Sequence, residues 1–322
     1  MSHKVQTMAY VGEVPWHGLG SALPADPTIA QMRKAAGLTW EPQLLEQRFT
    51  FDGKPRTSPD KILVRSDTGF VLDTVGAKYV PILNEQVLEF FREYVAAGDL
   101  TLETAGVLDG GRYVWALAKM KAGFAVAGDK TDRTEGYVWL ANPHVYGQGA
   151  VAKFTAVRVV CWNTWQAALA GGRAGVKIWH TADFDADRRK EVQEEMGIAR
   201  ERLATFKTTA ELLAGTTLVD AVAKKLTAKI FKKEAATAEA KKWDDAPRVV
   251  RRVVALYDGE AKGAALLTAK ATAWGLFNAV TQYVDWEHGK TADTRMRQAW
   301  LGSGATLKQR ALDVLTEYAA KK

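Results

Sequence analysis

The sequence predicts an α+β fold, in which a mostly antiparallel sheet with packed helices is followed by an all-helical region. Short apolar alternations recur up to about residue 160, and Asp109-Gly110-Gly111 between two of them is a clear hairpin signal. After residue 180, alanine, lysine and glutamate dominate, and periods of three and four replace the alternation. We therefore expect an α+β core domain over residues 1–180 and a helical domain with basic helices over residues 181–322.

Two helices and two groups of strands are expected in the first domain. Thr28 is a suitable N-cap for a helix over Ile29–Ala36, which Gly37 would end. Asn84 could cap a second helix, which Gly98 stops. The expected strands cover residues 47–51, 61–65, 70–75, 100–108, 112–119, 124–127, 136–142 and 150–160.

Helical periodicity begins near Asn163 and dominates after residue 180. Glu234–Asp245 is a polar link, and Pro247 is a favourable first-turn residue for the helix that follows it. The expected helices cover residues 183–214, 217–233, 247–258, 264–287 and 305–321.

Composition excludes several classes of protein. With 322 residues, 47% of them hydrophobic, the chain can bury a core, which excludes dominant disorder. No apolar run reaches the roughly 18–20 residues of a membrane span, and no secretory signal is visible. The chain has a single cysteine, Cys161, which cannot form an internal disulfide, as is typical of proteins in a reducing cytosol. We expect Cys161 to be a buried thiol rather than a nucleophile. The five histidines lack metal-site spacing, so we expect no metal, no cofactor and no catalytic constellation.

Positive charge is concentrated in Val222–Arg252. This stretch has ten basic and four acidic residues, so it carries +6 of the formal net charge of +7. If the apolar faces of its two helices are buried, the cations project outward and can bind phosphates by releasing counterions. A merely solvated basic face is the alternative interpretation. The residues assigned to phosphate binding are Lys224, Lys225, Lys232, Arg248, Arg251 and Arg252.

A second, weaker patch surrounds two tryptophans. Lys153, Arg158, Trp162 and Trp165 lie at the end of the β region, where the rings could stack on unpaired bases. The alternative is that these tryptophans are core residues, because one face of the sheet must be buried against helices.

Two motif-like stretches are rejected. Residues 123–131 resemble a phosphate loop, but Asp129 stands between the glycine and the lysine, so a strand followed by a turn is expected. Residues 183–187 alternate aspartates as a calcium loop does, but Arg188 occupies the position of the required glycine.

Several stretches carry a resemblance to a known family. They are Trp16–Gly20, Ala36–Trp40, Val64–Gly69, Tyr79–Glu85, Glu103–Gly106, Gly110–Arg112 with Trp115, Thr155–Thr164, Trp179–Thr181 and Asn278–Asp285. In this order they cover nearly the whole chain, which resembles the phage/plasmid-like proteins built on DUF932, a domain of unknown function. Trp162 and Leu83 depart from the residues usual in that family, which puts a polar role at those two positions in doubt.

The resemblance implies a phage, prophage or plasmid gene and a cytoplasmic setting in a bacterial host cell. The order of elements is also similar to that of phage single-strand annealing recombinases, a likeness at the level of fold only. Together with the basic helices, this favours a non-enzymatic, ATP-independent protein that binds single-stranded DNA and anneals strands during replication or recombination. Annealing needs many bases on one surface, so a homo-oligomeric ring or filament is expected, without membrane contact.

Two other functions stay open. A metal-dependent nucleic-acid enzyme would need converging carboxylates, for which Glu103, Asp109 and Glu135 are the best available. A host-interaction or inhibitor protein would use the basic helices against an acidic protein surface.

Overall fold

The computed structural model describes residues 5–12, 20–96, 100–158, 163–166, 176–178, 180, 201–289 and 303–322. These residues form two sheets and a set of helices, which confirms the predicted α+β class. The chain divides into two compact units. Unit 1 comprises residues 1–121, 137–154 and 173–198, and unit 2 comprises residues 122–136, 155–172 and 199–322.

The larger sheet has the strand order β10-β9-β8-β7-β6-β1-β2, with β11 paired to β9. β1 pairs parallel with β2, whereas β6 is antiparallel to both β1 and β7. The hairpin predicted at Asp109-Gly110-Gly111 is confirmed as the connection of β6 to β7. The strands are β1 (Val5–Val11), β2 (Ser21–Leu23), β6 (Leu100–Leu108), β7 (Tyr113–Val126), β8 (Asp129–Pro143), β9 (Ala150–Arg158), β10 (Asn163–Gln166) and β11 (Val176–Ile178).

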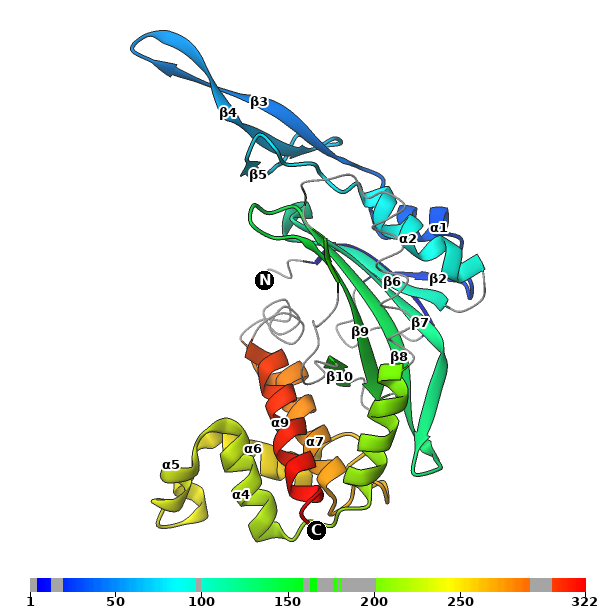
Figure 1. Cartoon of the computed structure of the whole chain (residues 1–322), viewed down its shortest axis with the longest axis vertical. Coiled ribbons are helices and arrows are strands. Elements are labelled where there is room, and N and C mark those ends of the chain that lie inside the picture. The colour runs from blue at the N-terminus through cyan, green and yellow to red at the C-terminus, as the bar shows by residue number, and fades with distance from the viewer. Residues whose placement is uncertain are drawn as a thin grey trace. The chain divides into compact units, whose positions relative to one another are not determined.

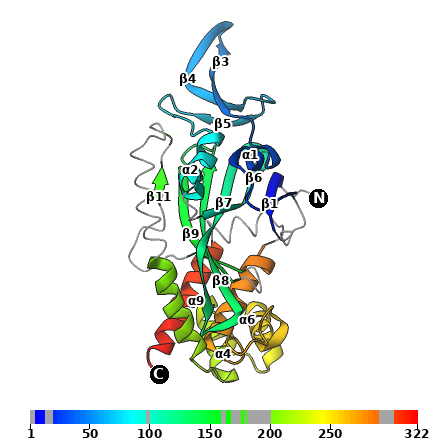
Figure 2. The same cartoon turned by 90° about the vertical axis from the view of Figure 1, so that its right-hand side faces the viewer.

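Helices α1 (Ile29–Ala35) and α2 (Asn84–Ala96) pack against each other and against β6 (Figure 2). Thr28 caps α1 as predicted, because its hydroxyl accepts from the Gln31 N–H while the Gln31 side chain accepts from the Thr28 N–H. Helix α2 turns an apolar face inward, since its Leu88 and Phe91 are completely buried.

The smaller sheet, in unit 1, has the order β3-β4-β5, with β3 (Pro42–Phe51), β4 (Lys54–Arg65) and β5 (Val71–Val75). Its β3–β4 hairpin is longer than the sequence predicted and turns at Asp52-Gly53, both with positive φ. The strand around Pro55 was missed because proline cannot donate to a ladder. It is tolerated here because β5 pairs only with residues 61–64, which leaves one edge of β4 open near Pro55.

Unit 2 consists mainly of helices (Figure 1), and their apolar residues form a buried core. α4 packs against α6, α7 and α9, and α7 packs against α9. Residues 201–214 are also helical. The named elements are α4 (Asp220–Phe231), α5 (Glu234–Ala238), the 3-10 turn η2 (Trp243–Asp245), α6 (Arg248–Ala255), the π turn η3 (Leu256–Glu260), α7 (Ala273–Gln282), the π turn η4 (Tyr283–Glu287) and α9 (Ser303–Ala319).

Two predicted helices are corrected by the structure. The helix expected from Asn163 is wrong, because residues 163–166 form strand β10, antiparallel to β9; cross-strand pairing outweighs the weak local preference there. The helix expected from residue 264 begins only at Ala273. Thr272 caps it by accepting the Gly275 N–H, after Ala271 breaks the helical backbone with a φ of 56°.

Of the two rejected motifs, the structure describes the phosphate-loop-like stretch but not the aspartates that resemble a calcium loop. Residues 127–128 form a tight turn between β7 and β8, with φ values of 48° and 81°, so a strand and a turn replace any phosphate loop, as predicted. The aspartates at residues 183–187 lie outside the described residues, as does Cys161.

Candidate functional site

The predicted phosphate-binding residues of the basic stretch lie on α4 and α6 and at the C-cap of α4, in unit 2. Lys224 pairs with Asp220 at 2.7 Å. Arg252 pairs with Glu287 at 2.7 Å and also with Glu260, and the hydrogen bonds to these carboxylates raise its pKa. These two cations are therefore already occupied by carboxylates.

The other four predicted residues have no carboxylate partner in the part of the chain that the structure describes. Lys225, Lys232 and Arg248 are exposed. Arg251 is half-buried, and its Nε donates to the Ala246 carbonyl at 3.0 Å. Three cations of the predicted set are thus open to solvent for an anionic partner.

Tertiary structure makes the basic stretch less positive than its sequence indicates. Four carboxylates from outside the stretch pair with its cations: Asp220, Glu260, Glu287 and Glu317. Counting them with the four internal acids, and adding Lys321, which shares Glu317, leaves eleven cations against eight carboxylates, a local charge of +3 instead of +6. The predicted track is therefore reduced to a few open cations.

Aromatic rings lie next to cations on the helices of unit 2. The Lys224 ammonium is 4.5 Å from the centroid of Trp243, and that of Lys262 is 4.1 Å from Trp286. Burial raises the pKa of Tyr283, whereas the nearby charge of Arg248 opposes the rise. Trp243 is 36% exposed. The unit thus has an exposed ring, that of Trp243, beside positive charge, and an exposed ring beside cations is suited to stacking on unpaired bases.

The second predicted patch is less well suited to phosphate. Lys153 lies in β9 and is half-buried, and this burial lowers its pKa. Arg158 ends β9, and Trp165 lies in β10 opposite Ala156. Trp162 lies outside the described residues. Desolvation of Lys153 weakens its capacity to hold a phosphate, because its charged form is disfavoured there.

The three carboxylates considered for a metal enzyme lie on different elements. Glu103 is in β6 and 3.9 Å from Lys119, and Asp109 begins the turn after that strand. Glu135, in β8 of unit 2, pairs with Arg133 at 3.0 Å. No cluster of three histidine, cysteine, aspartate or glutamate side chains suited to a metal occurs among the described residues.

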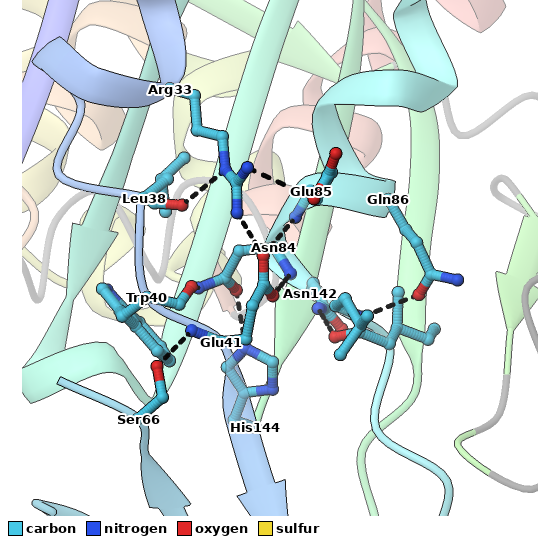
Figure 3. Close-up of polar contacts among 12 residues, drawn as sticks. Arg33, Leu38, Trp40, Glu41, Ser66, Asn84, Glu85, Gln86, Asn142 and His144 are labelled. Atoms are coloured by element: carbon cyan, nitrogen blue, oxygen red, sulfur yellow. Dashed lines mark hydrogen bonds and ion pairs between the residues drawn. The ribbon is translucent and has the colours of Figure 1, made fainter. Parts of the chain in front are cut away.

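Sequence reasoning missed a buried polar network in unit 1, centred on Asn84 at the start of α2 (Figure 3). The Asn84 Nδ2 donates to the Trp40 carbonyl at 2.8 Å, and its Oδ1 is 3.1 Å from His144 Nε2. Asn142 Nδ2 donates to the Ile82 carbonyl at 2.9 Å. Since Asn84 Oδ1 can only accept, this geometry assigns the proton of neutral His144 to Nε2.

Glu41 joins this network to the N-terminus of α2. Its Oε2 accepts the Asn84 N–H at 2.6 Å and its Oε1 accepts the Glu85 N–H at 3.2 Å, while Arg33 pairs with Oε1 at 2.5 Å. Burial raises the pKa of Glu41, and these N–H groups and the arginine oppose the rise. A carboxylate at this end of the helix is favourable because the unpaired N–H groups carry partial positive charge.

Two histidines extend the network away from Asn84. The ring centroids of His144 and His180 are 6.4 Å apart, Trp40 packs edge-on against His144, and Tyr79 stacks on His180 at 4.7 Å. Burial lowers the pKa of His144 to about 3 and that of His180 to about 4. Nearby backbone carbonyls oppose the shift of His180. Both rings are therefore neutral at pH 7.

Several polar atoms of this network are unsatisfied. Among the described residues, Trp40 Nε1, Tyr79 OH, Asn142 Oδ1 and His144 Nδ1 are buried without a hydrogen-bond partner. Each such atom costs about 1–3 kcal/mol. Its central residues, Asn84, Asn142 and His144, are completely buried, so we interpret the network as a polar core that orders unit 1 rather than as a site of chemistry.

The Trp40 ring also contacts the guanidinium of Arg65. The Arg65 guanidinium lies 4.3 Å from its ring centroid and donates to Asp67 at 2.7 Å and to Gln6 at 2.7 Å. Gly111, with a φ of +111°, allows this close packing, because an added Cβ would be 2.9 Å from the Trp40 ring. Trp40, Asn84 and His180 all belong to stretches that carry the family resemblance, which was the available signal for this network.

Comparison with known proteins agrees with that resemblance. The family described as "Domain of unknown function (DUF932)" matches residues 71–307. No curated protein and no solved structure matches the chain. No helix among the described residues has the length and apolarity needed to cross a bilayer. Because the match covers well over half of its residues, the chain belongs to the DUF932 family.

Proposed function

We propose that this protein binds single-stranded nucleic acid, most simply single-stranded DNA, through the open cations and rings of α4, η2 and α6. The observation that supports this most is the set of exposed cations without carboxylate partners in the described residues, Lys225, Lys232 and Arg248, on helices that also present Trp243. Phosphates would displace counterions from the cations while bases stack on rings. This proposal needs neither ATP nor a metal.

The setting of this activity is part of the same proposal. A phage or plasmid protein of this kind would act in the bacterial cytoplasm, holding exposed bases while a complementary strand is tested during replication or recombination. Strand annealing would need several copies arranged as a ring or filament. Lys224 and Arg252 would contribute little, because a phosphate must first displace the carboxylates that already pair with them.

Titration of binding against salt tests the proposal. Affinity for a labelled single-stranded oligonucleotide should fall as salt rises, with a slope of about 0.7 for each phosphate contacted. The triple variant K225Q/K232Q/R248Q should bind more weakly and lower this slope by about 2.

Lys229 supplies the matched control. It lies on the same helix and is similarly exposed, but it already pairs with Glu317 at 3.3 Å, so K229Q should leave the slope nearly unchanged. Absent or salt-independent binding of the wild-type chain refutes the proposal. Capture of one stoichiometric acidic host protein, insensitive to nuclease, would instead support the host-interaction function.

A further inference from the structure

One face of the β3–β4 hairpin in unit 1 carries large apolar side chains in solvent. Strand alternation places Leu45, Phe49 and Phe51 on this face, with exposed fractions of 49%, 51% and 67%. Val71 of the adjoining strand β5 is 49% exposed. Contiguous exposed apolar residues of this size mark an interaction surface more often than they mark a chance arrangement.

Two cations of this face lie directly opposite its rings. Arg56 is the cross-strand partner of Phe49, and Lys54 is the partner of Phe51. Directly opposed residues have their Cβ atoms about 4.5–5.5 Å apart, so each ring has a cation beside it. Both cations are exposed, and neither pairs with a carboxylate in the described ranges.

The opposite face of the same hairpin is different. Its charged residues are Glu46, Arg48 and Lys61: Glu46 pairs with Arg48 at 2.9 Å and has Lys61 as its cross-strand partner. Residues 43, 45, 47, 49, 51, 54 and 56 of the ring-bearing face include no acid, but strand alternation also places the exposed Asp60 of β4 on this side. The two faces therefore differ in ring content, and only the first has cations directly opposite exposed rings.

We propose that this face, with Phe49, Phe51, Lys54 and Arg56, is a binding site for single-stranded nucleic acid. Residues two apart on a strand are separated by about 6.8 Å. Successive stacked bases are about 3.4 Å apart, so the interval between Phe49 and Phe51 matches one base held between two rings. Lys54 and Arg56 neutralise the phosphates on either side of that base.

The site is distinct from the surface of the proposed function. The hairpin belongs to unit 1 and the basic helices belong to unit 2, so the two surfaces can be altered separately. Neither needs the other to bind a strand.

The test is fluorescence anisotropy of a labelled dT20 oligonucleotide with the full-length chain. The base held between the two rings contributes about 1–3 kcal/mol, so F49A/F51A should weaken binding at least about 5-fold. K54Q/R56Q should lower the slope of log affinity against log salt concentration by about 1.4.

T50A is the matched control. Thr50 lies between the two rings in sequence, is exposed, and belongs to the opposite face. This variant should bind as the wild type does, and circular dichroism should show every variant folded.

The outcomes separate the two proposals. If F49A/F51A binds like T50A, the hairpin site is overturned, even where K225Q/K232Q/R248Q loses binding. If the hairpin variants lose binding while the helix variant keeps it, the hairpin site stands and the helical surface fails. A wild-type chain that ignores dT20 but binds vesicles of anionic lipid, or only self-associates, overturns the hairpin site as well.

Discussion

Acidification from pH 7 to pH 5 is expected to destabilise unit 1 by about 4 kcal/mol, about 2 kcal/mol for each of His144 and His180. Burial lowers the pKa of these rings to about 3 and about 4, whereas a histidine in the unfolded chain has a pKa near 6.5. Below pH 6.5 the two histidines therefore become protonated in the unfolded state but stay neutral in the folded state. A loss of this size is a large part of the total stability of a typical domain.

The direction of this effect follows from linkage. Above pH 6.5 both states leave the rings neutral, so the histidines contribute no pH dependence. Between pH 6.5 and the folded-state pKa values, each ring lowers the free energy of unfolding by about 1.4 kcal/mol per pH unit. Glu41 acts in the opposite sense near its own titration, because its pKa is raised in the folded state and protonation is then less unfavourable there.

Urea titrations at pH 7, 6 and 5 measure this loss, and a variant isolates its source. H144Q removes one titrating group but keeps an N–H donor for Asn84 Oδ1, so it should halve the fall in unfolding free energy between pH 6.5 and pH 5. A wild-type midpoint that stays constant over this range, or a variant with the full pH dependence, would contradict the assignment.

Local patterns in the sequence were sufficient where the structure depends on neighbours along the chain. The cap of α1 and the hairpin at residues 109–111 each involve residues a few positions apart, and both were predicted correctly. β10 was missed because its partner strand, not its own residues, decides its conformation. The length of the β3–β4 hairpin was missed because Pro55 argues against a strand unless the open edge of the sheet is known.

The charge pattern of the proposed surface could be predicted only in part, for a related reason. Counting charges along the chain identified α4 and α6 but could not show which cations would be neutralised. The carboxylate that pairs with Lys229 is 88 residues away, and one partner of Arg252 is 35 residues away. The Asn84 network has the same character, since its partners lie 44 and 60 residues from it. Such pairings become visible only when the chain is folded.

Replacing Lys308 with methionine is expected to destabilise unit 2 by about 3–5 kcal/mol. Lys308 of α9 is completely buried and pairs with Asp285 of η4, which is 9% exposed. Burial lowers the pKa of Lys308, whereas Asp285 opposes the shift by stabilising the charged form. Removing the Lys308 ammonium leaves the desolvated Asp285 carboxylate without this cation. The free-energy cost of that change is larger than the net contribution of the ion pair to stability.

A double-mutant comparison separates the two quantities. The variant K308M/D285L replaces the pair with apolar side chains of similar size, and it should recover most of the stability that K308M loses, since the desolvation of both charges is also removed. The exposed pair Lys229–Glu317 is the control, because both of its side chains are about half exposed and K229M should cost less than about 1 kcal/mol. Denaturant midpoints at an unchanged m-value give each free energy of unfolding.

If K308M and K229M lower the free energy of unfolding equally, burial does not determine the strength of the Lys308–Asp285 pair. If K308M/D285L is as unstable as K308M, the loss comes from packing around the lysine rather than from the desolvated carboxylate of Asp285.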